Sequence, residues 1–489
     1  QSIILIPEIS LTPQMVERFK GRFGPDIAVF HSRLSDGERF DEWMRVKLGN
    51  AKIAIGARSA IFLPFENLGL IVIDEEHEAS YKSDSDPKFD AREIAYMKCE
   101  LENCKLVLGS ATPSVESYYK TTIDELSLIT INERADGAAM PKVEIVDMRE
   151  ELMNNNRSIF SKSLHEGIAL CLSKNEQVIL FLNRRGFSTF VSCRKCGYVF
   201  KCKKCDISLT YHSAGEYLTC HYCGEKEKIS KVCPSCGSSY VKYFGVGTEK
   251  IEQEINRIFP SARTLRMDFD TTRKKNSYEY IYNTFKSKGA DILIGTQMVA
   301  KGLDFKDVTL VGVIAADLSL NLPDYRAFER TFQLLTQVSG RAGRGSKEGK
   351  VVIQTYSADD LTIKYAANND YDSFYKNEIM MREAMQYPPF TSILVITMSS
   401  ENEEMLIKNI QSVGENLKYR IKDNNKITLL GPCTCGVSKI KNFYRWQIII
   451  KGDIKETIAL EIKNSVYESV KNVYSIIRVS IDINPSNMI

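Results

Sequence analysis

Short apolar runs separated by amphipathic segments mark the first 130 residues of the chain. Such runs, bounded by polar or turn residues, are typical of strands that are buried on both faces. A helix is expected after the first run, with Thr12 as its N-cap and Pro13 at its first helical position. Alternating strands and helices predict a parallel sheet covered by helices over residues 1–130. The strands are expected at residues 3–6, 52–56, 70–73 and 105–108.

The same alternation returns after a looser segment at 131–153, which carries Gly137 and Pro141 and is interpreted as a linker. A cysteine-rich segment interrupts this second series, so we interpret it as an insertion. The predicted organisation is a linker and the start of a second α/β domain (131–192), the insertion (193–239) and the remainder of that domain (240–372). Its strands are expected at 178–182, 292–294, 309–315 and 351–355, and its helices at 249–259 and 328–339.

The last segment, residues 373–489, has a different order of elements. Strands are expected at 392–398, 427–430, 445–451 and 476–483, with helices at 403–421 and 455–470. The resulting βαββαβ order predicts a ferredoxin-like α+β domain.

Composition limits the possible classes of protein. The chain has 489 residues, 43% of them hydrophobic and 26% charged, which is ordinary for globular domains. Its 65 basic and 62 acidic residues give a net charge of +3, so any surface for nucleic acid must be local. We expect no membrane span, because no apolar run is long enough, and a cytoplasmic protein, because no signal peptide opens the chain. The chain begins with Gln1 rather than Met and runs almost at once into an expected strand, which suggests that it is a fragment.

Eight of the 13 cysteines form four C-x-x-C pairs within 44 residues, which is a strong signal for metal binding. Four thiolates around one tetrahedral Zn²⁺ is the usual structural site, so eight predict two Zn²⁺ ions; an iron site or a redox dithiol is the alternative. The spacing does not determine which pairs share an ion. Neighbouring lysines and aromatic residues either contact DNA or cover and solubilise the module. The cysteines are Cys193, Cys196, Cys202, Cys205, Cys220, Cys223, Cys233 and Cys236.

The stretch GLIVIDEEHEAS (69–80) places carboxylates at the end of an apolar strand. Asp74 is suited to hold Mg²⁺ carried by nucleotide phosphates, and Glu75 to orient the attacking water. The alternative is a polar turn after a buried strand. A second strand end carries GSATPS (109–114), which alone is an ordinary junction between strand and helix.

The stretch QVSGRAGRG (337–345) places Arg341 and Arg344 three residues apart, where a helix would point both the same way. Such arginines can neutralise the charge of a phosphoryl-transfer transition state. The alternative is a solvated basic helix end.

The order of these motifs resembles the superfamily-two helicases, with DEEH, GSATPS, ILIGTQMVAKGLDF (292–305) and QVSGRAGRG as motifs II, III, V and VI. The chain resembles most the PriA family of replication-restart helicases (primosomal protein N′). ILIPEISLTPQ (4–14), ARSAIFLPF (57–65), FLNRRGFS (181–188), GVGTEKIEQE (245–254), YRWQIIIKG (444–452) and the cysteine block follow that family's order.

This resemblance implies an α/β protein with two RecA-like lobes, a zinc-ribbon insertion with two four-cysteine sites in the second lobe, and the C-terminal α+β domain. It implies a 3′–5′ DNA helicase that uses ATP with Mg²⁺, recognises stalled or branched forks and starts primosome assembly. Its partners would be single-stranded and forked DNA, single-strand-binding protein and helicase-loader proteins, with the protein itself a monomer.

The resemblance also implies roles for particular residues. Nesting would place Cys193, Cys196, Cys233 and Cys236 on one ion and Cys202, Cys205, Cys220 and Cys223 on the other. Arg58 and Lys301 are candidates for phosphate contacts, and Tyr81 and Phe89 for stacking on single-stranded DNA. The nucleotide contacts would come from Asp74, Glu75, His77, Gln337, Arg341 and Arg344.

The main departure from this family is the P-loop, G-x-x-x-x-G-K-[ST], which the 489 residues do not contain. We therefore expect the intact protein to hydrolyse ATP and this chain alone to hydrolyse little or none, because the P-loop amides and lysine grip the phosphates. The competing hypothesis is a non-catalytic zinc-containing DNA-binding or scaffold protein. Another translocase of the same superfamily is disfavoured by the cysteine block and the C-terminal segment.

Overall fold

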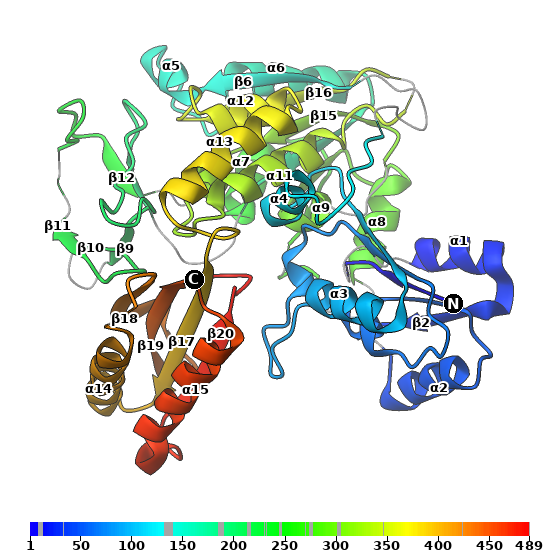
Figure 1. Cartoon of the computed structure of the whole chain (residues 1–489). Coiled ribbons are helices and arrows are strands. Elements are labelled where there is room, and N and C mark those ends of the chain that lie inside the picture. The colour runs from blue at the N-terminus through cyan, green and yellow to red at the C-terminus, as the bar shows by residue number, and fades with distance from the viewer. Residues whose placement is uncertain are drawn as a thin grey trace. The chain divides into compact units, whose positions relative to one another are not determined.

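The structure is a computed structural model with two compact units, residues 1–128 and 129–489 (Figure 1). Each unit is described by itself. The structure describes residues 1–7, 13–32, 34–131, 140–183, 190–212, 217–228, 230, 232–243, 247–268, 270–272, 277–300, 305–345, 347–422 and 424–488.

The first unit contains a five-stranded parallel sheet in the order β2-β3-β1-β4-β5. The four predicted strands are present, and β2 is an addition that the sequence pattern did not reveal. Thr12, the expected N-cap, lies outside the described residues. The strands are β1 (Ser2–Leu5), β2 (Ile27–Phe30), β3 (Ile53–Gly56), β4 (Leu70–Asp74) and β5 (Lys105–Gly109). The helices are α1 (Pro13–Phe23), α2 (Asp36–Lys47), α3 (Ala91–Glu102) and α4 (Val115–Thr122).

The central strands of this sheet are fully buried on one face and half-buried on the other. Ile3 and Leu5 of β1 and Ile71 and Ile73 of β4 alternate along their strands and have no exposed surface, whereas Ile4 and Val72 between them are half-buried. Parallel strands end at the same edge, and Asp74, the last residue of β4, pairs with Gly109, the last residue of β5. The sheet therefore places the first residue of DEEH beside the first residue of GSATPS.

The second unit contains a six-stranded parallel sheet in the order β13-β14-β7-β15-β16-β6. Its strands are β6 (Lys142–Asp147), β7 (Gln177–Phe181), β13 (Thr264–Met267), β14 (Ile292–Gly295), β15 (Val308–Val313) and β16 (Lys350–Thr355). Its helices are α5 (Met148–Met153), α6 (Lys162–Ser173), α7 (Thr248–Ile258), α8 (Ser277–Lys286), α9 (Gln297–Ala300), α10 (Asp317–Leu320), α11 (Ala327–Ser339), α12 (Leu361–Ala367) and α13 (Tyr371–Ala384).

The interpretation of residues 131–153 as a linker is wrong for its second half. Residues 142–147 form β6, which pairs in parallel with β16, and residues 148–153 form α5. β6 is an edge strand whose side chains are mostly half-buried, so its sequence, KVEIVD, lacks the continuous apolar run of the inner strands.

The cysteine-rich module, defined here as residues 193–239, begins and ends at one antiparallel pair. β8 (Val191–Cys193) enters it and pairs with β12 (Val241–Tyr243), which leaves it. Between them, β9 (Thr210–His212), β10 (Tyr217–Thr219) and β11 (Lys226–Lys228) form an antiparallel sheet in the order β11-β10-β9. Because β7 precedes the module and β13 follows it in one sheet, the predicted insertion is confirmed.

The C-terminal region, defined as residues 392–488, has the predicted βαββαβ order. Its elements are β17 (Ser392–Ser400), α14 (Glu403–Ile421), β18 (Ile427–Ile440), β19 (Phe443–Gly452), α15 (Glu456–Val470) and β20 (Arg478–Ile483). All strand pairs are antiparallel, in the order β18-β19-β17-β20, which is the ferredoxin-like arrangement. In the part of the chain that the structure describes, no helix is long and apolar enough to cross a membrane.

Candidate functional site

The acidic motif begins at the carboxyl end of β4 with Asp74. The Tyr81 hydroxyl donates to the Asp74 carbonyl at 2.5 Å and to the Leu5 carbonyl at 3.1 Å, which ties the loop after β4 to β1. Burial raises the pKa of the Asp74 carboxyl, and a hydrogen bond from the Glu75 amide partly opposes this. The Asp74 side chain is half-buried at the end of the sheet, where a hard cation such as Mg²⁺ finds its preferred oxygen ligand.

Glu75 has an unusual backbone conformation. Its φ of 47° lies in the left-handed region, which non-glycine residues seldom adopt and which costs about 1–3 kcal/mol. Strained backbone of this kind persists where the surrounding structure over-determines it. Hydrogen bonds hold the residues on both sides of Glu75: the Tyr81 hydroxyl donates to the Asp74 carbonyl, and the Ser114 amide donates to the Glu76 carboxylate.

Glu76 is the third carboxylate of the motif, and it has an anchoring position. It is 1% exposed, and its carboxylate accepts hydrogen bonds from the Ser114 amide at 2.6 Å and from the Ser114 and Ser117 hydroxyls at 3.1 and 2.9 Å. Ser114 is the N-cap of α4, so Glu76 connects the acidic loop to the first turn of that helix. Burial raises the pKa of Glu76, although the Arg92 charge and these hydrogen bonds lower it in part.

Arg92 connects the same loop to α3. It donates to the Glu76 carbonyl at 2.9 Å and forms an ion pair with Asp90 at 2.7 Å. Burial of Asp90 by itself raises its pKa, but the hydrogen bonds and charge of Arg92 outweigh this, so the pKa of Asp90 is lowered. Asp90 is also the N-cap of α3. The anchoring contacts of Glu76 are not readable from local sequence, because Arg92 is 16 residues away and Ser114 and Ser117 are 38 and 41 residues away.

His77 connects DEEH to GSATPS. Its Nδ1 lies 2.7 Å from the Ser110 hydroxyl and 3.7 Å from a Glu75 carboxylate oxygen. The contact between His77 and Ser110 therefore links the loop after β4 to the loop that leads into α4.

The predicted DNA-contacting residues are placed differently from one another. Tyr81 is 1% exposed, so its ring has no face available for stacking and the structure contradicts that prediction. The physical reason is that two buried carbonyls accept from its hydroxyl. Phe89 is half-buried and meets the Phe62 ring edge to face at 4.9 Å. Lys301 lies outside the described residues.

Arg58 is half-buried and faces the loop that follows DEEH. It donates to the Ser80 carbonyl at 3.2 Å and to the Lys82 carbonyl at 2.8 Å. In this structure Arg58 therefore holds that loop in position.

The arginines of QVSGRAGRG do not lie on a helix as predicted. Helix α11 ends at Ser339, and Arg341 and Arg344 follow in a turn, while Gln337 remains on the helix. Gly343, at φ 68°, lies between them, and a Cβ added there would be 2.7 Å from the Gly349 amide nitrogen. Because glycine is needed for this turn, the spacing of three does not carry the helical meaning that we assigned to it. The Arg344 Nε donates to the Gly340 carbonyl at 2.9 Å, and its side chain is exposed.

The eight cysteines form two groups of four in which all ligand atoms lie within 4.8 Å of one another. The first cluster contains Cys193, Cys196, Cys233 and Cys236, and the second contains Cys202, Cys205, Cys220 and Cys223. This is the nested grouping that the family resemblance implied.

The distances fit a tetrahedral zinc site. Zinc–sulfur bonds of about 2.3 Å give sulfur–sulfur edges of about 3.8 Å in a tetrahedron. The measured Sγ–Sγ distances are 3.7 Å for Cys193–Cys236, 3.6 Å for Cys196–Cys233 and 3.6 Å for Cys202–Cys223. A disulfide would need about 2.05 Å, and all eight cysteines are free thiols. When bound, Zn²⁺ would supply a structural crosslink between the knuckles of each cluster.

Four family descriptions match the chain. They are "DEAD/DEAH box helicase" over residues 1–121, "Helicase conserved C-terminal domain" over 239–346, "PriA DNA helicase Cys-rich region (CRR) domain" over 202–228 and "Primosomal protein N C-terminal domain" over 383–486. The two parallel sheets are therefore of the RecA-like helicase type that the resemblance implied.

Curated relatives named "Replication restart protein PriA" match most or all of the chain. The Bacillus subtilis protein is 47% identical over 100% of this chain and 60% of its own length. The Rickettsia felis protein is 37% identical over 100% of this chain and 74% of its own length. The chain thus spans only about 60% of the B. subtilis relative.

Among solved structures, RecG bound to a three-way DNA junction matches with a TM-score of 0.41 and 14% identity, covering 80% of this chain and 40% of that one. A likeness of this size supports no argument about function.

Proposed function

The chain belongs to the PriA family of replication restart proteins, and on that premise we propose that it forms most of the motor of an ATP-dependent DNA helicase. The observation that carries the proposal is the anchored DEEH loop. A carboxylate at the end of a parallel sheet, in a loop that His77 joins to the next motif, suits a site for Mg²⁺ and nucleotide.

In the proposed mechanism, Asp74 holds the Mg²⁺ that accompanies ATP, and Glu75 orients the attacking water. His77 relays the state of this loop to Ser110 and α4, while Arg341 and Arg344 neutralise charge on the transferred phosphoryl group, with Gln337 as a further nucleotide contact. Positioning and charge stabilisation account for most of the catalysis of such reactions. When bound, Mg²⁺ would neutralise negative charge on the nucleotide phosphates.

We propose further that the motor moves 3′ to 5′ on single-stranded DNA, recognises stalled or branched forks and starts primosome assembly with single-strand-binding and loader proteins. These properties rest on family membership. Arg58, Phe89 and Lys301 remain proposed DNA contacts. Zinc would stabilise the cysteine-rich module, and the protein would act as a monomer in the cytoplasm.

The competing proposal is a zinc-containing protein that binds DNA without hydrolysis. The absence of a P-loop from these residues favours it for the chain by itself. Against it stand the Asp74 carboxylate at the end of β4 and the two arginines, Arg341 and Arg344, for which a protein without a nucleotide has no physical need.

The two proposals separate on the response of DNA binding to ATP. We would measure the affinity for single-stranded DNA with and without a non-hydrolysable ATP analogue, for this chain and for a longer protein that includes a P-loop upstream. The helicase proposal expects the analogue to change the affinity of the longer protein and not that of the chain. An affinity that is indifferent to nucleotide in both proteins would favour the binding protein.

A further inference from the structure

The two four-cysteine clusters differ in what surrounds them. Cysteines of the second cluster belong to a hydrophobic core that continues into the C-terminal sheet and into the segments that flank α11 and α13. That core includes Cys202, Cys205, Cys220, Tyr222, Tyr325, Tyr387, Ile393, Val395, Ile449 and Met488. The metal ligands thus lie inside a core shared by three parts of the second unit.

The backbone between the ligands of the second cluster faces the C-terminal sheet. His221, between Cys220 and Cys223, is 1% exposed, and its carbonyl accepts hydrogen bonds from the Gln447 Nε2 at 2.7 Å and from the Cys433 thiol at 3.2 Å. Its Nδ1 lies 2.9 Å from the Thr434 carbonyl. His221 is therefore not one of the clustered metal-ligating residues but a docking residue that the sequence did not reveal.

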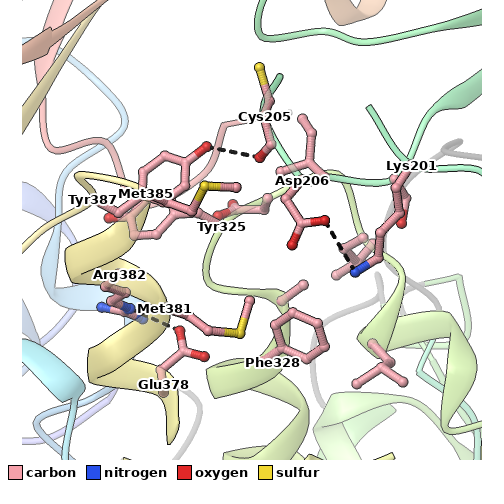
Figure 2. A pocket seen from close by; sticks show the side chains of 16 residues that line it. Lys201, Cys205, Asp206, Tyr325, Phe328, Glu378, Met381, Arg382, Met385 and Tyr387 are labelled. Carbon is pink, nitrogen blue, oxygen red and sulfur yellow. Dashed lines mark hydrogen bonds and ion pairs between the residues drawn. The ribbon is translucent and has the colours of Figure 1, made fainter. Parts of the chain in front are cut away.

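The other side of the same cluster faces the helices of the parallel-sheet domain. The Tyr387 hydroxyl donates to the Cys205 carbonyl at 3.3 Å, and Figure 2 shows this bond at the rim of a pocket. The Tyr325 amide donates to the Tyr222 hydroxyl at 3.3 Å, and the rings of Tyr325 and Tyr387 stack at 4.8 Å. The buried Arg382, paired with Glu329 and Glu378, supports this wall of the pocket.

The first cluster lacks such surroundings. None of its four cysteines belongs to the shared core in the described part of the chain. Cys236 is exposed, and a Cβ on Gly197 would meet the Tyr356 carbonyl, which follows β16 of the parallel sheet. At Gly197 its neighbours outside the module are thus the loop after β16 and Arg149 of α5, both in the parallel-sheet domain.

We propose that the second cluster is a metal-dependent staple that holds the C-terminal region against the parallel-sheet domain, and that the first cluster has no part in this docking. The carbonyls of Cys205 and His221 accept from the two sides, and they keep their positions only while four thiolates share an ion. Without the ion, the small module has too little hydrophobic core to hold the two C-x-x-C loops of the second cluster in place. The inference does not depend on ATP hydrolysis, so either proposal can fail alone.

Thermodynamic coupling makes the proposal testable without changing a ligand of the second cluster. If the ion favours docking, docking must favour retention of the ion by the same factor. Gln447→Met removes the donor to the His221 carbonyl at nearly constant volume. In the full chain carrying Cys236→Ser to disable the first cluster, we expect equilibrium competition with a chromogenic chelator to show about tenfold weaker affinity for the remaining zinc, which corresponds to about 1.4 kcal/mol.

The matched control is Ile410→Val, which trims the core of the C-terminal region on α14, away from the module. It should leave the zinc affinity within about twofold. Equal zinc affinities for Gln447→Met and its parent, or an equal loss of affinity in Ile410→Val, would overturn the staple.

Hydrogen exchange measures the converse direction in the full chain. Cys223→Ser should raise amide exchange in β18 and β19, whereas Cys236→Ser should not. Equal exchange in the two variants would overturn the proposal, and if Cys223→Ser fails to fold, the Gln447→Met measurement still decides.

Discussion

The acidic loop of the first unit and the arginine turn of the second are both obvious as sequence motifs, but they are built in different ways. Side chains anchor the acidic loop, through Glu76, Tyr81 and Arg92. Backbone contacts at glycines shape the arginine turn and leave Arg344 exposed. A motif thus predicts which reactive side chains are present. How rigidly they are positioned depends on the contacts that the residues around the motif make elsewhere in the fold.

The largest expected loss of unfolding free energy comes from a change in the anchors of the acidic loop. Arg92→Ala would leave the buried Asp90 without its cation and the Glu76 carbonyl without its donor, which should cost about 3–5 kcal/mol of unfolding free energy. Urea unfolding of the chain checks this. The control is Lys52→Ala, which breaks an exposed ion pair with Asp26 and should cost at most about 1 kcal/mol. Similar losses in both variants would show that the anchor is unimportant.

On the arginine side, Gly343→Ala should be the damaging change. The added Cβ meets the Gly349 amide at 2.7 Å in a left-handed backbone, so we expect a loss of about 1–3 kcal/mol. Gly37→Ala in α2 is the control, because nothing lies within 4 Å of its Cβ and alanine favours a helix by up to about 1 kcal/mol. A neutral Gly343→Ala in thermal unfolding would contradict a turn built on backbone contact.

A smaller effect is expected from Tyr81→Phe. The ring stays buried and only the hydroxyl that serves the Leu5 and Asp74 carbonyls is lost, so the cost should be about 1 kcal/mol. Tyr419→Phe, at an exposed position, should change the unfolding free energy little. If Tyr81→Phe were as mild as this control, the hydroxyl would not anchor the loop.

The smallest effect on stability is expected from Arg344→Ala, at about 0.5 kcal/mol or less, because the side chain is exposed. In a longer protein that includes a P-loop, the same change should lower ATP turnover by about 10³-fold if Arg344 acts as an arginine finger. Measuring the melting temperature and the ATP turnover of the same variant separates a structural role of Arg344 from a role in hydrolysis. Loss of both together would mean that Arg344 is structural.

The sequence predicted the elements with the strongest patterns. The apolar runs at 70–73 and 178–182 became central strands, and the helix at 403–421 has the predicted bounds. β6 was missed because an edge strand needs no continuous apolar run. A spacing of three residues between Arg341 and Arg344 predicts a shared helix face only if the helix continues through both. Helix α11 instead ends at Ser339, with Gly340 as its C-cap.

Long-range contacts explain the rest of what was missed. Tyr81 stands in a polar loop of the sequence, and only the fold reveals the two carbonyls that bury its hydroxyl. His221 likewise finds its partners more than 200 residues away. The C-x-x-C pairs were readable because the ligands of each pair are local, but nesting is a property of the folded module.

The most direct test of the account is ATP hydrolysis by a longer protein that includes a P-loop, measured with single-stranded DNA for the parent and for Asp74→Asn. Glu66→Gln, at an exposed position, is the control. The account predicts that Asp74→Asn abolishes DNA-stimulated hydrolysis while zinc content and fold stay unchanged. Full hydrolysis by Asp74→Asn would contradict the assignment of this loop to the nucleotide site.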